Sequence, residues 1–262
     1  MKVCFSTLGC TERSLAQVLA LAKAYHMDGI EIRGLGGLLR NADIPELQPE
    51  YAPAVRSALR DAGLVPVVLG TSCQFHAGVR WDDVMTEGQA SIRAAQRLGI
   101  PFIRVFGNYF RPDAATAVRR VIDGIRSLLN DTADTNVTVL LEIHADFHRA
   151  EELLAIVNGI NSPRFGLLWD VYHSDATYGD DWMTLYRQIC PYIRHVHIKD
   201  YHRTDGRLCL PGDGDLPLSP ILRQLEADEF DGFVSLEWER LWHPELPEIE
   251  AALDAFRLVI DR

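Results

Sequence analysis

The sequence predicts an α/β protein built as one (β/α)8 TIM barrel over residues 1–262, and three observations lead to this fold class. The chain has 262 residues, close to the roughly 250 of a typical barrel of this kind. Short apolar segments alternate with amphipathic ones, which predicts parallel strands separated by helices. No Pro/Gly-rich linker, low-complexity tract or block of like charges divides the chain, so we expect a single domain.

The expected strands are short apolar runs, which is typical of strands that are buried on both faces of a parallel sheet. They cover residues 2–6, 29–33, 65–70, 102–106, 139–142, 167–170, 195–197 and 234–237. Eight strands is the number that closes such a sheet into a barrel. An open sheet with seven or nine strands is the alternative.

The expected helices lie between these strands and place apolar residues at positions i, i+3, i+4 and i+7. Leu15, Val18, Leu19 and Ala22 illustrate this spacing, which forms one apolar helix face. The expected helices cover residues 14–24, 53–62, 84–98, 114–130, 150–160, 182–190, 218–227 and 245–260.

Composition and charge limit the classes of partner. An apolar fraction of 47% with 24% charged residues is ordinary for a soluble globular protein. No apolar run approaches the roughly 18–20 residues of a membrane span, and residues 1–6 do not resemble a signal peptide. A net charge of −11 opposes binding to nucleic acid. We therefore expect a small-molecule substrate, and neither a membrane nor a nucleic acid as partner; a homo-oligomer is compatible with the sequence.

The cysteines indicate the redox compartment. There are five, an odd number, and none forms a Cys-x-x-Cys pair. This pattern favours reduced thiols in a cytoplasmic setting over a disulfide framework or a zinc knuckle.

The last four expected strands each end in a side chain that can bind a metal. These residues are Glu142, Asp170, His197 and Glu237. The C-terminal ends of barrel strands meet at one mouth, so the four side chains should share a pocket. Three carboxylates and one imidazole suit one divalent ion, with Mn²⁺ first and Mg²⁺, Co²⁺ or Zn²⁺ as alternatives.

Each of these residues also has a simpler interpretation. A single carboxylate at a strand end is commonly a helix N-cap or an ion-pair partner, and a single histidine is commonly a satisfied core residue. Four on successive strands favour the metal site, because buried ionisable groups are costly without a cation or a partner. Proximity to the strand end favours His197 over His195 and Glu237 over Glu239.

The second half of the chain resembles the sugar phosphate isomerase/epimerase family of xylose-isomerase-like TIM barrels, the ketose 3-epimerases in particular. The resemblance lies in segments 141–144 (LEIH), 169–173 (WDVYH), 195–200 (HVHIKD), 210–215 (LPGDGD) and 232–237 (GFVSLE). It implies that Glu142, Asp170, His197 and Glu237 bind the metal and that the two glutamates are also catalytic. It further implies that His173, three residues after the aspartate, and Arg203, six after the histidine, contact substrate. An exposed loop position is the alternative for Arg203.

The ligand set suggests a reaction class. A divalent ion bound to a carbonyl and the neighbouring hydroxyl acidifies the proton on the α-carbon. One carboxylate could remove that proton to give an enediolate, and a second could return a proton on the opposite face. The leading hypothesis is therefore a metal-dependent isomerase or epimerase of a ketose, keto-sugar or related polyhydroxy carbonyl compound.

Two further reaction classes compete with this hypothesis. A lyase or dehydratase of a keto-sugar or cyclitol would expel a β-substituent from the same intermediate. A phosphodiester hydrolase, like the DNA-repair endonucleases with this barrel plan, is disfavoured by the acidic charge and the single-metal ligand set. A metal-free binding protein would leave the buried carboxylates unexplained.

Other polar residues near strand ends have two interpretations each. His144 shares a strand face with Glu142 and is expected to contact substrate, and His76, just past the third strand, is a further candidate. Glu31 and Arg33 could pair with each other or bind substrate. Lys199 could assist catalysis or form an ion pair with a carboxylate. Few basic residues cluster at the strand ends in the sequence, which favours an unphosphorylated substrate.

Overall fold

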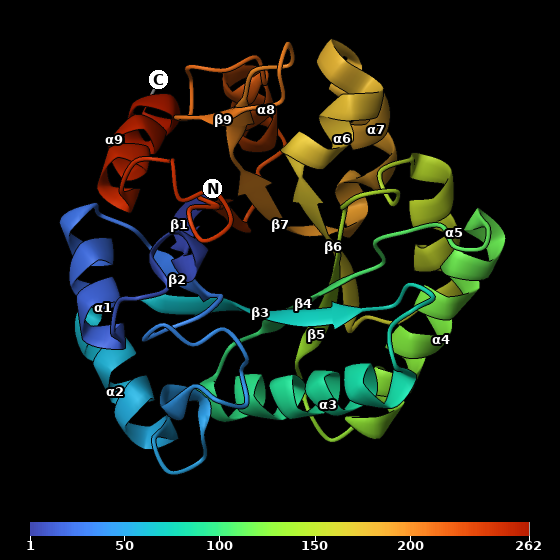
Figure 1. The fold of residues 1–262 in the computed structure, drawn as a ribbon, viewed down its shortest axis with the longest axis horizontal. Coiled ribbons are helices and arrows are strands. Elements are labelled where there is room, and N and C mark those ends of the chain that lie inside the picture. The colour runs from blue at the N-terminus through green and yellow to red at the C-terminus, as the bar shows by residue number, and fades with distance from the viewer. Residues whose placement is uncertain (262) are drawn as a thin grey trace.

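Eight parallel strands close into a barrel at the centre of the molecule (Figure 1), in the order β1-β10-β7-β6-β5-β4-β3-β2. The computed structural model describes residues 1–261. The strands are β1 (Lys2–Ser6), β2 (Gly29–Ile32), β3 (Val65–Gln74), β4 (Phe102–Phe106), β5 (Thr138–Glu142), β6 (Phe165–Asp170), β7 (Ile193–Ile198) and β10 (Phe233–Leu236). Closure through the β1–β10 pair confirms the predicted barrel and excludes the open sheet for this chain.

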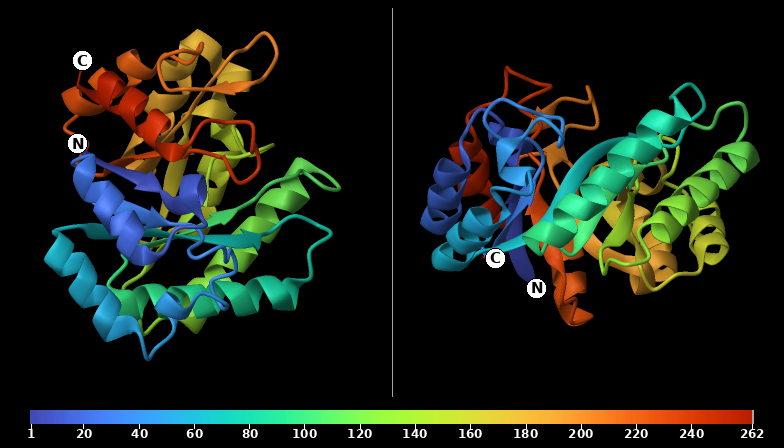
Figure 2. Two further views of the ribbon diagram at one scale, coloured as in Figure 1. Left: turned by 60° about the vertical axis from the view of Figure 1, so that its left-hand side comes forward. Right: turned by 90° about the horizontal axis from the view of Figure 1, so that it is seen from below.

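The helices surround the barrel and follow one another around it in chain order, as Figures 1 and 2 show. They are α1 (Leu15–Ala24), α2 (Ala52–Ala62), α3 (Trp81–Leu98), α4 (Ala114–Asp131), α5 (Ala150–Ile160), α6 (Val171–Tyr178), α7 (Trp182–Ile189), α8 (Leu218–Ala227) and α9 (Ile249–Ile260). Short 3-10 helices are η1 (Thr7–Cys10), η2 (Pro45–Leu47), η3 (Gly179–Asp181) and η4 (Cys190–Tyr192). None of the helices in residues 1–261 combines the length and apolarity needed to cross a membrane.

Local signals explain where several helices begin and end. Ser14 caps α1 through a capping box, in which its side chain accepts from the Gln17 N–H and Gln17 accepts from the Ser14 N–H. Gly63 and Gly99 end α2 and α3 in the left-handed conformation, with φ of 71° and 75°. The last helix begins at Ile249 rather than at residue 245, because Pro247 disfavours helical backbone at the residue before it.

Two features were missed by the sequence analysis. Helix α6 starts directly after β6, with Asp170 as its N-cap, so no loop signal separates the strand from the helix. A small antiparallel hairpin, β8 (Asp200–Tyr201) and β9 (Leu208–Cys209), follows β7. The Asp200 carboxylate holds the following loop by accepting hydrogen bonds from the backbone N–H groups of Gly212, Gly214 and Leu216.

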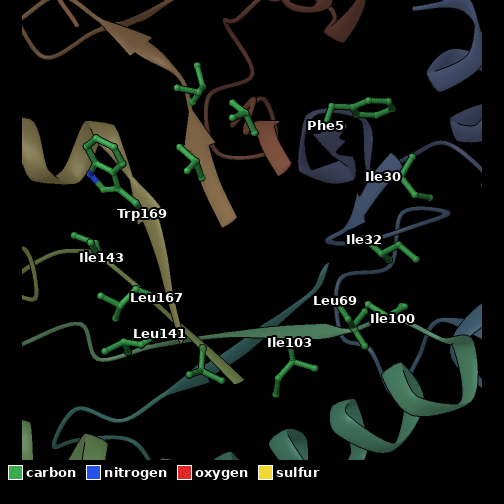
Figure 3. Close-up of a cluster of buried hydrophobic side chains, with 14 of the residues drawn as sticks. Phe5, Ile30, Ile32, Leu69, Ile100, Ile103, Leu141, Ile143, Leu167 and Trp169 are labelled. Carbon is green, nitrogen blue, oxygen red and sulfur yellow. The ribbon is translucent and has the colours of Figure 1, made fainter. Parts of the chain in front are cut away.

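Strand alternation divides the apolar side chains into two layers. The outer layer packs between the strands and the helices, and Figure 3 shows Ile103, Leu141 and Leu167 within it. The inner layer fills the barrel itself and consists of Cys4, Val67, Val68, Leu140, Leu168 and Phe233. Leu140 lies inside the barrel and Leu141 outside it, as the alternation of side chains along a strand requires. Because the inner layer fills part of the lumen with apolar side chains, the inward-facing polar groups further along the strands gather toward the C-terminal ends.

We expect Leu141→Ala to lower the free energy of unfolding by about 2–5 kcal/mol, because it leaves a cavity in the outer layer. Leu141 is fully buried, whereas Leu258 is 64% exposed. The matched control Leu258→Ala should change the stability by less than about 0.5 kcal/mol. Urea unfolding followed by circular dichroism measures both, and equal effects of the two variants would contradict this layering.

Candidate metal centre and active-site cavity

The four predicted ligands converge at the C-terminal ends of neighbouring strands. The register places Asp170 of β6 beside His197 of β7, and His197 beside Ser235 of β10, two residues before Glu237. Each of Glu142, Asp170, His197 and Glu237 offers an atom, and these atoms all lie within 4.8 Å of one another. All four residues are buried. The structure therefore brings together the ligand set that the sequence predicts.

The buried polar atoms of this cluster lack enough protein partners. Glu142 Oε2, Asp170 Oδ2 and His197 Nδ1 form no hydrogen bond among the described residues. Their nearest charged neighbours are Arg104 Nη1 at 3.2 Å, Lys199 Nζ at 2.8 Å and Glu237 Oε1 at 3.3 Å, respectively. Buried polar atoms are nearly always satisfied, so the incomplete hydrogen bonding of these three atoms is compatible with a further ligand at this position. Their chemistry, two carboxylate oxygens and an imidazole nitrogen, fits a divalent cation. We therefore treat the cluster as a candidate metal centre.

Asp170 fulfils two roles with its two oxygens. Its Oδ1 accepts a hydrogen bond from the Tyr172 N–H at 2.9 Å and so caps helix α6, while Oδ2 lies 2.8 Å from Lys199 Nζ, on the side of the cluster. The N-cap interpretation and the ligand interpretation are therefore compatible at this residue.

Glu31 on β2 supports His197 from across the barrel. Its Oε2 lies 2.8 Å from His197 Nε2 and 3.0 Å from His195 Nε2. An imidazole that donates Nε2–H to a carboxylate is held in one orientation with Nδ1 free for a metal. Of the two interpretations of Glu31 and Arg33, the mutual ion pair is therefore wrong, because Glu31 contacts the two histidines instead. Substrate binding by these residues stays a prediction.

Neighbouring charged groups shift the pKa values of Glu31 and His197. Burial alone would raise the pKa of Glu31, but His197 and His195 outweigh it and hold that pKa well below its usual range. Burial alone would lower the pKa of His197, but the carboxylates of Glu237 and Glu31 raise it well above its usual value.

Lys199 supplies a buried positive charge beside the ligands. Its Nζ lies 2.8 Å from Asp170 Oδ2 and also contacts carboxylate oxygens of Glu237 and Glu239. Burial opposes the charged form, but Asp170, Glu237 and Glu239 raise the pKa of Lys199 well above its usual value. The ion-pair interpretation of Lys199 is confirmed, and the ammonium form leaves it able to donate a proton but not to accept one.

Glu142 and Glu237 differ in their environments. Burial raises the pKa of Glu142 to about 8, although Arg104, whose Nη1 lies 3.2 Å away, opposes the shift. Burial also disfavours the ionised form of Glu237, but His197 and Lys199 outweigh it and hold the pKa well below the usual value. Both glutamates thus depend on nearby cations.

A cavity of about 230 Å³ opens at these residues. Its wall consists of Leu8, Arg33, Gln74, Arg104, Phe106, Asn108, Glu142, His144, Lys199, Glu237, Glu239 and Trp242. This volume is below the roughly 300–1,000 Å³ of pockets for drug-sized ligands, so it suits a small substrate. A larger hollow of about 590 Å³ lies between residues 40–48 and α3 and includes none of the four ligands.

The cavity contains more positive charge than the sequence analysis expected. Arg33, Arg104 and Lys199 all line it, although few basic residues seemed to gather at the strand ends. Arg33 lies directly after β2, and Arg104 lies within β4. Arg104 was missed because it does not stand beside a recognisable motif. Arg33 has two interpretations from the sequence, as a partner of Glu31 or as a substrate contact, and its position in the cavity wall fits the second interpretation.

The other predicted substrate residues have different positions. His144 lines the cavity and packs on His173, with ring centroids 3.9 Å apart, and His173 Nε2 lies 3.8 Å from Asp170 Oδ2. Burial lowers the pKa of each histidine to about 3, so both rings are neutral at pH 7. The structure therefore places both predicted histidines next to the ligand cluster.

His76 and Arg203 lie outside the cavity wall. His76 Nε2 bonds to the Gln74 side chain, and it is Gln74 that reaches the cavity. Arg203 forms ion pairs with Asp175 at 2.7 Å and Asp180 at 2.9 Å, and its side chain is one-third exposed. Substrate contact by either residue stays a prediction.

The chain is a closed parallel barrel with acidic side chains and a histidine at the C-terminal ends of its strands. This is where (β/α)8 enzymes place their active sites. The chain belongs to the xylose isomerase-like TIM barrel family, whose model matches residues 19–259. The predicted family resemblance is thereby confirmed.

Known proteins with similar sequence or structure include both dehydratases and epimerases. The inosose dehydratase of Lactiplantibacillus plantarum is 30% identical over 92 residues, which is 29% of this chain and 30% of that protein. The chain thus aligns with less than a third of that relative. The D-psicose 3-epimerase of Clostridium cellulolyticum H10, solved with D-tagatose, has a TM-score of 0.79 at 15% identity, with 99% of both chains covered.

A third similar protein contains a metal. The IolI protein, solved with a bound zinc atom, has a TM-score of 0.79 at 22% identity, covering 99% of this chain and 98% of that one. At such identities the structural likeness establishes the fold, which different reactions share.

We expect Glu31→Gln to weaken Mn²⁺ binding by about 10- to 100-fold, because the amide no longer fixes the His197 ring as a carboxylate does. His197→Ala should remove binding more completely. The control Glu50→Gln changes an exposed carboxylate and should leave the Kd unchanged. Calorimetric titration of the metal-free protein with Mn²⁺ gives the three values, and an unaltered Kd in Glu31→Gln would contradict the supporting role.

Metal affinity should rise with pH. In the metal-free protein Glu142 has a pKa of about 8 and His197 has a raised pKa, so both hold protons at neutral pH. A metal must displace these protons, which weakens binding below pH 8 by up to about tenfold per pH unit for each proton. Titrations with Mn²⁺ between pH 6 and 8.5 test this, and a constant affinity over that range would refute the displacement.

Proposed function

We propose that this protein is a divalent-metal-dependent isomerase or epimerase of a ketose, keto-sugar or related polyhydroxy carbonyl compound. The observation that supports the proposal most strongly is the pair Glu142 and Glu237, which enter one small cavity from β5 and the end of β10. Two carboxylates from different sides of a substrate can remove a proton and return one.

Glu142, Asp170, His197 and Glu237 would hold the ion, which when bound would polarise the substrate carbonyl and acidify the neighbouring C–H bond. Mn²⁺ is our first choice because the ligands are mostly oxygen atoms, and the zinc in the IolI structure supports a divalent ion in this family.

The protein side chains divide the proton transfers between them. His197 and Lys199 hold Glu237 in the ionised form, which is the form that accepts a proton. Arg104 contacts Glu142 and stabilises the carboxylate that remains when Glu142 gives up a proton. Removal of a proton by one glutamate and its return by the other on the opposite face inverts a carbon centre. The neutral rings of His144 and His173 can bind substrate hydroxyl groups.

A lyase or dehydratase is the second candidate, and Lys199 favours it. Its buried ammonium lies beside Glu237 and can donate a proton to a departing hydroxyl group once the α-proton has been removed. The partial match to inosose dehydratases is compatible with this reaction.

The setting of the enzyme is also part of the proposal. The cysteines are all free, and Cys4, Cys10 and Cys73 are buried. Reduced thiols support a cytoplasmic location. We further propose that residues 1–262 form one domain that acts on a sugar-like small molecule.

Deuterium exchange distinguishes the two reactions. We expect the Mn²⁺-loaded protein in heavy water to introduce deuterium beside the carbonyl of a ketose or inosose, as detected by NMR. An epimerised product supports the first reaction, and an unsaturated product supports the second. Glu142→Gln and Glu237→Gln should each slow exchange by about 10²- to 10⁴-fold, the usual contribution of a general base, whereas Glu50→Gln should not. Exchange that survives in both site variants would refute the proposed roles.

A further inference from the structure

Two arginines enter the cavity from the side opposite the candidate metal ligands. The ligands come from β5, β6, β7 and the end of β10, which are neighbours in the barrel. Arg33 and Arg104 come from β2 and β4, on either side of β3. Both arginines are buried, with exposed fractions of 7% and 2%. The wall of the cavity therefore has an acidic arc and a basic arc.

Gly70 on β3 makes room for both arginines. A Cβ atom at position 70 would lie 2.6 Å from Arg33 Cδ and 3.1 Å from Arg104 Nη2. Both side chains therefore cross the same gap above β3, and any larger residue would displace them. Two guanidinium groups brought together in a buried site repel each other unless an anion lies between them.

The described residues provide few negatively charged partners for the guanidinium groups of Arg33 and Arg104. Arg33 forms no ion pair with any residue in the described part of the chain, and it donates only to uncharged acceptors, Leu39 O at 3.1 Å and Ser72 Oγ at 3.0 Å. Arg104 contacts Glu142, a carboxylate that it would share with the metal.

Arg104 also has an unused donor. Its buried Nε has no hydrogen-bond partner among residues 1–261. A guanidinium carries five N–H donors in a planar fork that matches a carboxylate or a phosphate. An unmet donor on buried Arg104, beside an Arg33 that forms no ion pair among the described residues, favours a ligand that carries negative charge.

We propose that Arg33 and Arg104 form an anion subsite that binds a carboxylate or phosphate group of the substrate. This proposal rests on the proposed function, in which the metal and its acidic ligands would bind the carbonyl end of the substrate. The substrate is then an anionic keto-sugar, either a keto-uronate or a sugar phosphate, rather than a neutral ketose. A cavity of about 230 Å³ restricts it to a small molecule.

Matched ligands test the subsite without requiring turnover. D-Fructose, D-fructuronate and D-fructose 6-phosphate share one ketose end and differ in the charge at carbon 6, and the corresponding D-tagatose compounds form a second set. Calorimetry with the Mn²⁺-loaded protein measures each Kd. We expect an anionic member of at least one set to bind about 10- to 100-fold more tightly than its neutral parent. Preference for the uronate identifies a carboxylate, and preference for the phosphate identifies a sugar phosphate.

Variants assign any preference to the arginines. Arg33→Gln should reduce the ratio of anionic to neutral affinity to about one, and Arg33→Lys should restore part of it, because lysine keeps the charge but loses the fork. Arg93→Gln, which removes an exposed arginine on α3 that pairs with Asp134, should keep the wild-type ratio.

The inference is overturned if no anionic compound in either set binds more tightly than its neutral parent. It is also overturned if Arg33→Gln keeps the full wild-type ratio. The two proposals can fail separately. If deuterium exchanges into a neutral ketose and no anionic compound binds more tightly, the anion subsite is wrong and the proposed function stands. If anionic compounds bind more tightly but no deuterium is exchanged, the proton-transfer roles are wrong and the anion subsite stands.

Discussion

The register between β6, β7 and β10 is the constraint on which the site depends. It sets Asp170 beside His197 and brings Glu237 to the same level, so that inward-facing side chains from successive strands meet. Because side chains alternate along a strand, a slip of one residue would turn these groups toward the helices. The buried apolar layers hold the register, since the same slip would turn Leu140 and Leu168 out of the lumen and Leu141 and Leu167 into it.

The charges at this end of the barrel form one coupled system. Lys199 touches three carboxylates, Arg104 touches a fourth, and Glu31 is enclosed by two histidines. Burial alone would disfavour the charged forms of Lys199, Glu31 and Glu237, and their charged neighbours keep these three groups ionised. A change in the charge of one of these groups therefore shifts the pKa values of its neighbours.

Much of this arrangement could be predicted from the sequence, and the missing parts share a physical cause. Apolar runs and helical spacing located the barrel strands and most helices, and the strand-end rule located Glu142, Asp170, His197 and Glu237. Glu31 was misassigned because its partner His197 lies 166 residues away, across the lumen. Arg104 was missed, and the approach of Arg33 to it was not foreseen, because both depend on the space at Gly70, which no local sequence pattern indicates. Helix α6 was missed because it directly follows a strand.

The divided carboxylate of Asp170 limits how this scaffold can evolve. One carboxylate oxygen caps helix α6 and the other lies in the ligand cluster, so two independent functions constrain the residue type at position 170. Glutamate could still reach an ion, but its extra methylene would move the carboxylate away from the helix start. Asparagine could still cap the helix but would remove a negative charge. A change of reaction is therefore easier to reach by substitutions at other residues around the mouth of the barrel, where each side chain has a single function.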